Sequence, residues 1–201
     1  MNTPRLSRDV PIILLAGGRS SRMGRDKTRL MLNGETLLNR AYRRFSGEFA
    51  SVFVSVAPHF DPLPELPQEC LMPDIITGLG PASGLHAALM RFDSAFLVAV
   101  DMPLADPQLA KELIDGAYGF DAVAAVAHAT SELPTHKAAE PAFAFYQRTV
   151  LPELIAAIEG FDYSLNRLLH RINTRYVELP PDTLLNINFP ADYERLVNAI
   201  K

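Results

Sequence analysis

The chain has 201 residues, of which 48% are hydrophobic, and its formal net charge is -4. This length supports one domain with a substantial core, whereas two independent domains would both be small, so we expect residues 1–201 to form a single domain. The acidic balance argues against non-specific binding of nucleic acid, which needs a basic surface.

Cysteine usage and hydropathy indicate a compartment. Cys70 is the single cysteine, so no disulfide can form within the chain and a reducing compartment is the default. Residues 1–9 are polar and lack the apolar region of a secretory signal. The longest apolar run, residues 10–16, is too short to cross a bilayer. We therefore expect a cytoplasmic protein without a membrane or nucleic-acid partner.

The first half of the chain predicts alternating strands and helices. Residues 10–16 are apolar at every position, as in a strand buried on both faces of a parallel sheet. A helix is predicted over residues 36–49, where apolar side chains recur at helical spacing, and a second apolar strand over residues 51–57. A helix over residues 83–92 and a strand over residues 95–100 repeat the pattern.

The alternation continues into the second half. A helix is predicted over residues 107–118, with Asp106 as its N-cap and Pro107 at its first position. A shorter apolar strand is predicted over residues 122–126. Strands that alternate with helices indicate an α/β fold with a mostly parallel central sheet.

The last third is less regular. Residues 127–141 are polar and rich in small side chains, which predicts a long loop of the kind that often carries function. A short strand is predicted from Phe143, followed by helices over residues 150–159, 164–169 and 191–200.

A glycine-rich, basic segment follows the first strand. Gly17, Gly18 and Gly24 would let backbone N–H groups approach a phosphate chain, and Arg22 and Lys27 add positive charge. Ligands of open α/β sheets lie beyond the carboxyl ends of the strands, where this segment begins. It matches neither the P-loop pattern nor the dinucleotide fingerprint. A solvated basic turn is the alternative, but glycines and cations that converge at one strand end favour a phosphate site.

Asp101 directly follows the strand over residues 95–100, so it points to the same edge of the sheet as the glycine-rich segment. Mg²⁺ is usually held by one or two carboxylates together with substrate phosphates, which makes Asp101 the candidate ligand. An aspartate that caps the following turn is the alternative. We expect Asp101 to be poorly satisfied until a metal binds.

Two further segments carry weaker signals. The glycines of residues 74–84, Gly80 among them, permit close approach of a flat base, and Asp74 could accept hydrogen bonds from it. The segment could equally be a turn before a helix. Asn186 and Asn188 could offer neutral oxygens to a metal, although an asparagine before a helix is more often a cap.

Several segments together resemble molybdenum cofactor guanylyltransferases. They are Leu-Ala-Gly-Gly-x-Ser-x-Arg-Met-Gly-x-Asp-Lys at residues 15–27, Gly-Pro-x-x-Gly-Leu at 80–85, Val-Asp-Met-Pro at 100–103 and Asn-x-Asn-x-Pro at 186–190. Residues 140–146 also resemble a stretch of this family. The segments occur in the family's order and cover nearly the whole chain.

The resemblance implies a single-domain, Rossmann-like nucleotidyltransferase fold, with a nucleotide-binding part at about residues 10–126 and an acceptor-binding part at about residues 127–201. It implies transfer of GMP from GTP to the terminal phosphate of Mo-molybdopterin, with Mg²⁺ as cofactor and release of pyrophosphate. Transient contact with proteins of cofactor biosynthesis or with acceptor proteins is also implied. A related transferase that uses CTP or a sugar phosphate, and a catalytically silent nucleotide-binding protein, are the alternatives.

The resemblance also assigns roles to residues. Catalysis would depend on Lys27, Asp101 and Arg22, and the metal would bind Asp101 with Asn188, or with Asn186 in its place. The nucleotide contacts would be Leu15, Ala16, Gly17, Gly18, Lys27, Ser55, Asp74, Gly80 and Asp101.

Two positions depart from the family's pattern. Ser55 stands where the family often has asparagine, and because serine is the shorter group, one nucleoside contact of the family is in doubt at this position. Phe189 replaces the usual threonine before the last helix, which changes how that helix is capped.

Overall fold

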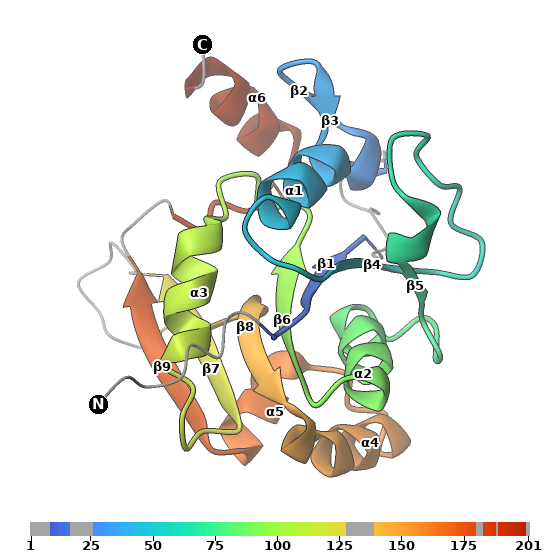
Figure 1. The fold of residues 1–201 in the computed structure, drawn as a ribbon. Coiled ribbons are helices and arrows are strands. Elements are labelled where there is room, and N and C mark those ends of the chain that lie inside the picture. The colour runs from blue at the N-terminus through green and yellow to red at the C-terminus, as the bar shows by residue number, and fades with distance from the viewer. Residues whose placement is uncertain (1–8, 17–25, 128–138, 180–182, 188, 200–201) are drawn as a thin grey trace.

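The computed structural model describes residues 9–16, 26–127, 139–179, 183–187 and 189–199. Its main sheet consists of β1 (Ile12–Leu15), β4 (Val52–Val56), β5 (Leu71–Pro73), β6 (Ser94–Ala99), β7 (Ala122–Ala127), β8 (Ala139–Gln147) and β9 (Thr174–Leu179). Their order across the sheet is β5-β4-β1-β6-β8-β7-β9 (Figure 1). All neighbouring strands are parallel except at the two sides of β8. The expected α/β fold with a mostly parallel sheet is confirmed.

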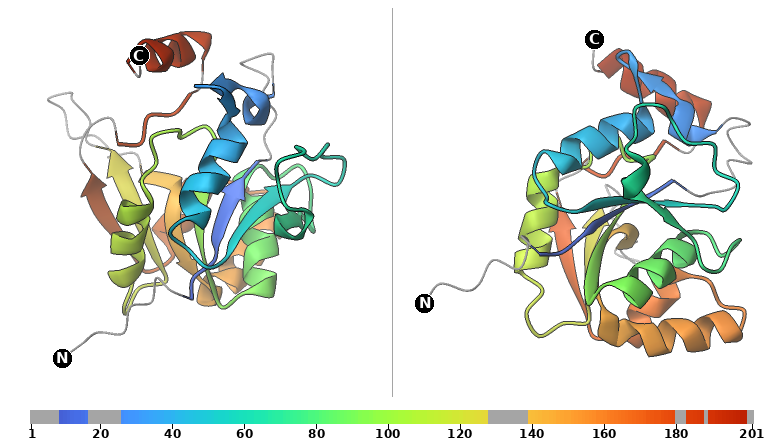
Figure 2. Two further views of the ribbon diagram at one scale, coloured as in Figure 1. Left: turned by 45° about the horizontal axis from the view of Figure 1, so that its top comes forward. Right: turned by 45° about the vertical axis from the view of Figure 1, so that its right-hand side comes forward.

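Helices cover both faces of this sheet. The first face carries α1 (Leu37–Ser46) and α3 (Pro107–Asp115), and the second carries α2 (Pro81–Arg91), α4 (Leu151–Glu159) and α5 (Leu165–Arg171) (Figure 2). Short 3-10 turns are η2 (Lys27–Arg29), η3 (Gln68–Cys70) and η4 (Arg148–Val150). None of the helices in the described ranges is long and apolar enough to cross a membrane.

A small hairpin lies outside the main sheet, next to the C-terminal helix. Its strands β2 (Met31–Leu32) and β3 (Glu35–Thr36) are antiparallel, and α6 (Pro190–Ala199) lies beside it (Figures 1 and 2). The hydroxyl of Tyr193 on α6 donates to the carbonyl oxygen of Met31. Helix α6 is thereby joined to the hairpin.

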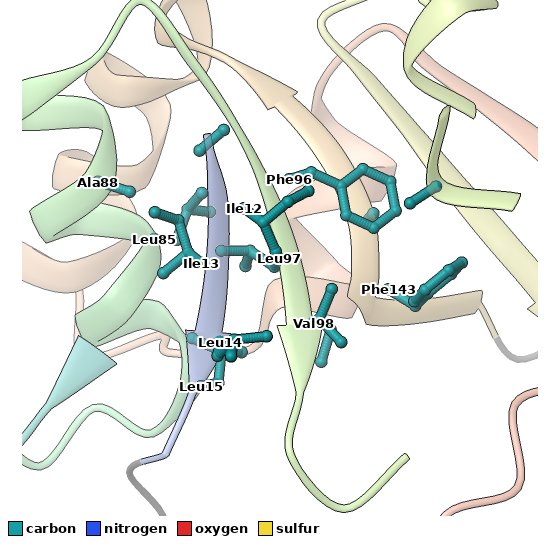
Figure 3. Packing of buried hydrophobic residues seen from close by; sticks show 14 of the residues in the cluster. Ile12, Ile13, Leu14, Leu15, Leu85, Ala88, Phe96, Leu97, Val98 and Phe143 are labelled. Carbon is teal, nitrogen blue, oxygen red and sulfur yellow. The ribbon is translucent and has the colours of Figure 1, made fainter. Parts of the chain in front are cut away.

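The core is built from the apolar runs that the sequence predicts as strands. All four residues of β1 are at most 8% exposed, because β1 is flanked by β4 and β6 and has helices on both faces. Figure 3 shows Leu85 and Ala88 of α2 next to Ile13 of β1. Phe96 and Phe143 pack edge to face with ring centroids 5.0 Å apart, a favourable geometry for aromatic rings. This packing fixes where the strands end, and therefore where polar side chains can gather.

Helix starts follow the local sequence. The side chain of Asp106 accepts a hydrogen bond from the backbone of Gln108, so the predicted N-cap of α3 is confirmed. Thr36 and Ser164 cap α1 and α5 in the same way. Each side-chain oxygen satisfies an N–H group that has no partner within its helix.

The long loop predicted over residues 127–141 is wrong at both ends. Ala127 belongs to β7, and β8 already begins at Ala139; residues 128–138 lie outside the described ranges. Small side chains and Pro141 made the region resemble a loop. The pairing of β7 with β8 jumps between Ala124 and Ala125, and proline is tolerated at such irregularities because the ladder does not need its missing N–H group.

Candidate functional site

The carboxyl ends of several strands bring the candidate residues to one edge of the sheet. Leu15, the last residue of β1, pairs in register with Ser55 of β4 and with Ala99 of β6. The backbone N–H of Asp74, just beyond β5, donates to the carbonyl oxygen of Val56. Ligands of α/β sheets usually lie beyond this edge.

Lys27 and Asp101 meet at this edge. The Nζ atom of Lys27 lies 2.7 Å from Oδ2 of Asp101, and the two side chains are only 21% and 22% exposed. Asp26 caps the short turn that carries Lys27, because its side chain accepts hydrogen bonds from the backbone N–H and the hydroxyl of Thr28. The expectation that Asp101 is poorly satisfied is therefore wrong, because the Lys27 cation already neutralises it.

The turn that carries Asp101 is held from two sides. The carbonyl oxygen of Asp101 accepts from the N–H of Ile187 at 2.9 Å. Two residues further on, the carbonyl oxygen of Pro103 accepts from Arg44 of α1 at 2.8 Å. The segment that carries Asn186 is thus hydrogen-bonded to the backbone of Asp101, the residue with which it was expected to hold a metal.

Glu140 is a site residue that reasoning from the sequence missed. One carboxylate oxygen accepts from Nδ2 of Asn186 at 2.8 Å, and the other accepts from the N–H of Ala142 at 3.3 Å. Burial raises the pKa of Glu140, and the nearby charge of Asp101 raises it further, although the hydrogen bonds oppose the shift. The available signal was its place in a stretch that resembles the family. Only the reversed direction of β8 brings the start of that strand to this edge.

Ser55 and Asp74 form a second polar pair. The hydroxyl of Ser55, only 2% exposed, donates to Oδ1 of Asp74 at 2.6 Å. Burial raises the pKa of Asp74, and the hydrogen bond from Ser55 opposes that shift. Gly80 precedes α2 with a φ of 62°, a backbone conformation that residues other than glycine rarely adopt. Asp74 therefore has one oxygen bound to Ser55 before any ligand arrives.

Gly84 permits α2 to pack closely against this pair. A Cβ atom at this position would lie 2.5 Å from Cδ2 of Leu15 and 2.6 Å from Oγ of Ser55.

We expect Gly84→Ala to lower the free energy of unfolding. Overpacking costs about 1–3 kcal/mol, and the better helix propensity of alanine offsets about 1 kcal/mol of that cost. Thermal melting measures the effect. Gly47→Ala is the matched control, because a Cβ there meets ordinary contacts at 3.5 Å; equal melting of both variants would contradict the argument.

The departure at Phe189 has a local compensation. The carboxylate of Asp192 accepts from the backbone N–H of Phe189 at 2.8 Å, which is half of a capping box at the start of α6. Helix α6 therefore begins without the usual threonine.

Four predicted site residues lie outside the described ranges, namely Gly17, Gly18, Arg22 and Asn188.

The oxygen donors at this edge are of the kind that a hard divalent cation prefers. Among the described residues no three His, Cys, Asp or Glu side chains gather to form a complete metal cage. Mg²⁺ does not need one, because it usually takes one or two carboxylates and completes its shell with phosphates and water. The carboxylate of Asp101 and the amide of Asn186 are donors of this kind, and the segments that carry them are hydrogen-bonded to each other.

Comparison with known proteins gives consistent matches. A family model described as MobA-like NTP transferase domain matches residues 12–176. A "Molybdenum cofactor guanylyltransferase" of Rhizobium johnstonii is 31% identical, over 94% of this chain and 93% of that protein. A "Probable molybdenum cofactor guanylyltransferase" of Pelotomaculum thermopropionicum is 36% identical over 68% of this chain, and the match spans 62% of that protein. The crystal structure of molybdopterin-guanine dinucleotide biosynthesis protein A from Archaeoglobus fulgidus has a TM-score of 0.76 at 24% identity, over 95% of this chain and 98% of that chain.

Proposed function

The chain belongs to the MobA-like NTP transferase family, and from that premise we propose that it transfers GMP from GTP to the terminal phosphate of Mo-molybdopterin and releases pyrophosphate. The names of the relatives support this donor and acceptor. The observation that carries the proposal is the contact of Lys27 with Asp101 at 2.7 Å, across 74 positions of sequence. A cation and a carboxylate at one strand edge are what a triphosphate and its metal need.

We assign the Mg²⁺ site to Asp101, with Asn186 or Asn188 as a further oxygen donor. When bound, the ion supplies charge neutralisation for the triphosphate. In the ligand-free chain the Lys27 ammonium neutralises the carboxylate of Asp101. Lys27 must therefore exchange its carboxylate partner for phosphate oxygens when the nucleotide and its metal bind.

The reaction requires positioning more than proton transfer. An oxygen of the acceptor phosphate bonds to the α-phosphorus of GTP, the bond from that phosphorus to the oxygen bridging to the β-phosphorus breaks, and pyrophosphate leaves. Lys27 holds the phosphates in line, together with Arg22 and the N–H groups of Gly17 and Gly18. No general base is needed, because the attacking oxygen is already ionised at neutral pH.

Asp74 is the proposed determinant for guanine. The N1–H and N2–H₂ groups of guanine are two donors on one edge, whereas adenine offers no such pair there. Ser55 occupies Oδ1 of Asp74 and holds the carboxylate in place. A base that left the second oxygen of this half-buried carboxylate without a donor would be rejected, because hydrogen-bonding sites discriminate strongly against ligands that lack the matching group.

We place acceptor binding in the part from about residue 127 to 201. Strand β8 of this part lies between β6 and β7 of the nucleotide-binding part, so both parts share one sheet and one core. This sharing supports a single domain in which Glu140 and Asn186 border the nucleotide residues.

Incubation of the protein with Mg²⁺, Mo-molybdopterin and either GTP, CTP or ATP tests the proposed function. Mass analysis of the product and release of pyrophosphate are the measurements. We expect the guanine dinucleotide form and a kcat/KM for GTP at least about 100-fold above those for CTP and ATP. Comparable values for CTP would refute the base assignment. No pyrophosphate release with any nucleotide would favour a catalytically silent binding protein.

A further inference from the structure

Glu140 is a half-buried carboxylate whose hydrogen-bond partners are neutral. Its two oxygens accept from the amide of Asn186 and from the backbone of Ala142. Within the described ranges no lysine or arginine forms an ion pair with it, and its charged neighbour is another carboxylate, Asp101. Burying a carboxylate whose hydrogen-bond partners are neutral is costly, and such arrangements concentrate at functional sites.

The chemistry of this contact fixes the orientation of Asn186. A carboxylate only accepts hydrogen bonds, so the NH₂ group of the amide must face Glu140 and its carbonyl oxygen must point away from Glu140. The backbone of the same segment is held independently, because the N–H of Ile187 donates to the carbonyl oxygen of Asp101 at 2.9 Å. Glu140 and Asp101 thus fix the side chain and the main chain of one short segment.

We infer that Glu140 is a positioning residue that turns the carbonyl oxygen of Asn186 toward the ligands bound at Asp101. The inference rests on the proposed function and deepens it. Glu140 does not touch the reacting atoms; it acts through Asn186. Residues that orient a metal ligand through a hydrogen bond typically contribute about 10- to 100-fold to metal affinity or activity.

The test measures binding of the Mn²⁺ complex of α,β-methylene-GTP, in which the bond that the reaction breaks is replaced. Water-proton relaxation reports the dissociation constant without turnover. We expect Glu140→Ala to weaken binding about 10- to 100-fold, and to raise KM for GTP in the same direction. Glu65→Ala is the matched control, because it removes another Glu–Asn hydrogen bond, to Asn39 at 3.0 Å; it should leave binding unchanged.

A reversed pair separates orientation from simple packing. Glu140→Gln alone permits two amide orientations at Asn186 and should weaken binding. The double variant Glu140→Gln with Asn186→Asp restores one orientation, because the new glutamine donates to the new carboxylate and leaves an oxygen toward the ligand. We expect the double variant to recover most of the affinity that Glu140→Gln loses.

The outcomes are distinguishable. Wild-type binding that Glu140→Ala leaves unchanged, even if that variant melts earlier, would overturn the positioning role but not the proposed function. A double variant that binds no better than Glu140→Gln would overturn it as well. Wild-type protein that binds no Mn²⁺ complex of the GTP analogue would overturn the proposed function and this inference together.

Discussion

Replacing Asp101 with alanine is expected to reduce pyrophosphate release by orders of magnitude while the protein stays folded. Neutralisation of the triphosphate by a metal contributes several kcal/mol to the transition state, and about 1.4 kcal/mol corresponds to a factor of ten. We expect the cost in stability to stay at about 1–2 kcal/mol, between the values for exposed and for buried ion pairs, because the Lys27 side chain that loses its partner is 21% exposed and can reach water. Pyrophosphate release at saturating GTP, acceptor and Mg²⁺, and thermal melting without ligand, measure the two effects.

Two further variants refine this experiment. Asp101→Asn should be only slightly more active than Asp101→Ala, because a neutral oxygen binds Mg²⁺ more weakly than a carboxylate does. Asp61→Ala is the control, since it removes an exposed carboxylate paired with Arg29 and should leave turnover unchanged. If Asp101→Ala melts far below the wild type, the residue is structural. If it folds and still turns over, the metal is held elsewhere.

Replacing Lys27 with methionine is expected to lower kcat/KM for GTP about 10- to 100-fold, because a charge-assisted hydrogen bond contributes about 1.5–3 kcal/mol. Methionine keeps an apolar stem and removes the charge. The same variant should bind Mn²⁺ more tightly in the absence of nucleotide, since Asp101 loses its ammonium partner at 2.7 Å. Steady-state kinetics and Mn²⁺ titration of the nucleotide-free protein are the two measurements.

A second ion pair of the same kind is the control for Lys27. Lys111 of α3 pairs with Glu48 at 2.5 Å in a more exposed place, so Lys111→Met should change neither GTP turnover nor Mn²⁺ binding. Wild-type turnover in Lys27→Met would mean that Lys27 does not hold the phosphates. Unchanged Mn²⁺ binding would mean that its contact with Asp101 does not compete with the metal.

Elements with strong local signals were predictable. The largely apolar segments that became β1, β4 and β6 need burial on both faces, and Asp106 caps α3 as its residue type suggests. The hairpin β2–β3 was missed although its turn carries Asn33 and Gly34, both with positive φ, a sequence that favours tight hairpins. Strands β5 and β9 were missed because one is only three residues long and the other lies at the sheet edge with exposed side chains.

The sequence by itself determined the alternation of strands and helices and the residue types at the strand ends, because burial and capping act over a few neighbouring positions. It could not determine that β8 runs against its neighbours, since strand direction depends on which strands pair. That direction decides that Glu140 reaches Asn186, 46 positions away, and Lys27 reaches Asp101 only through the packing of the whole sheet. Contacts between distant segments depend on the tertiary structure, because no local preference specifies the partner.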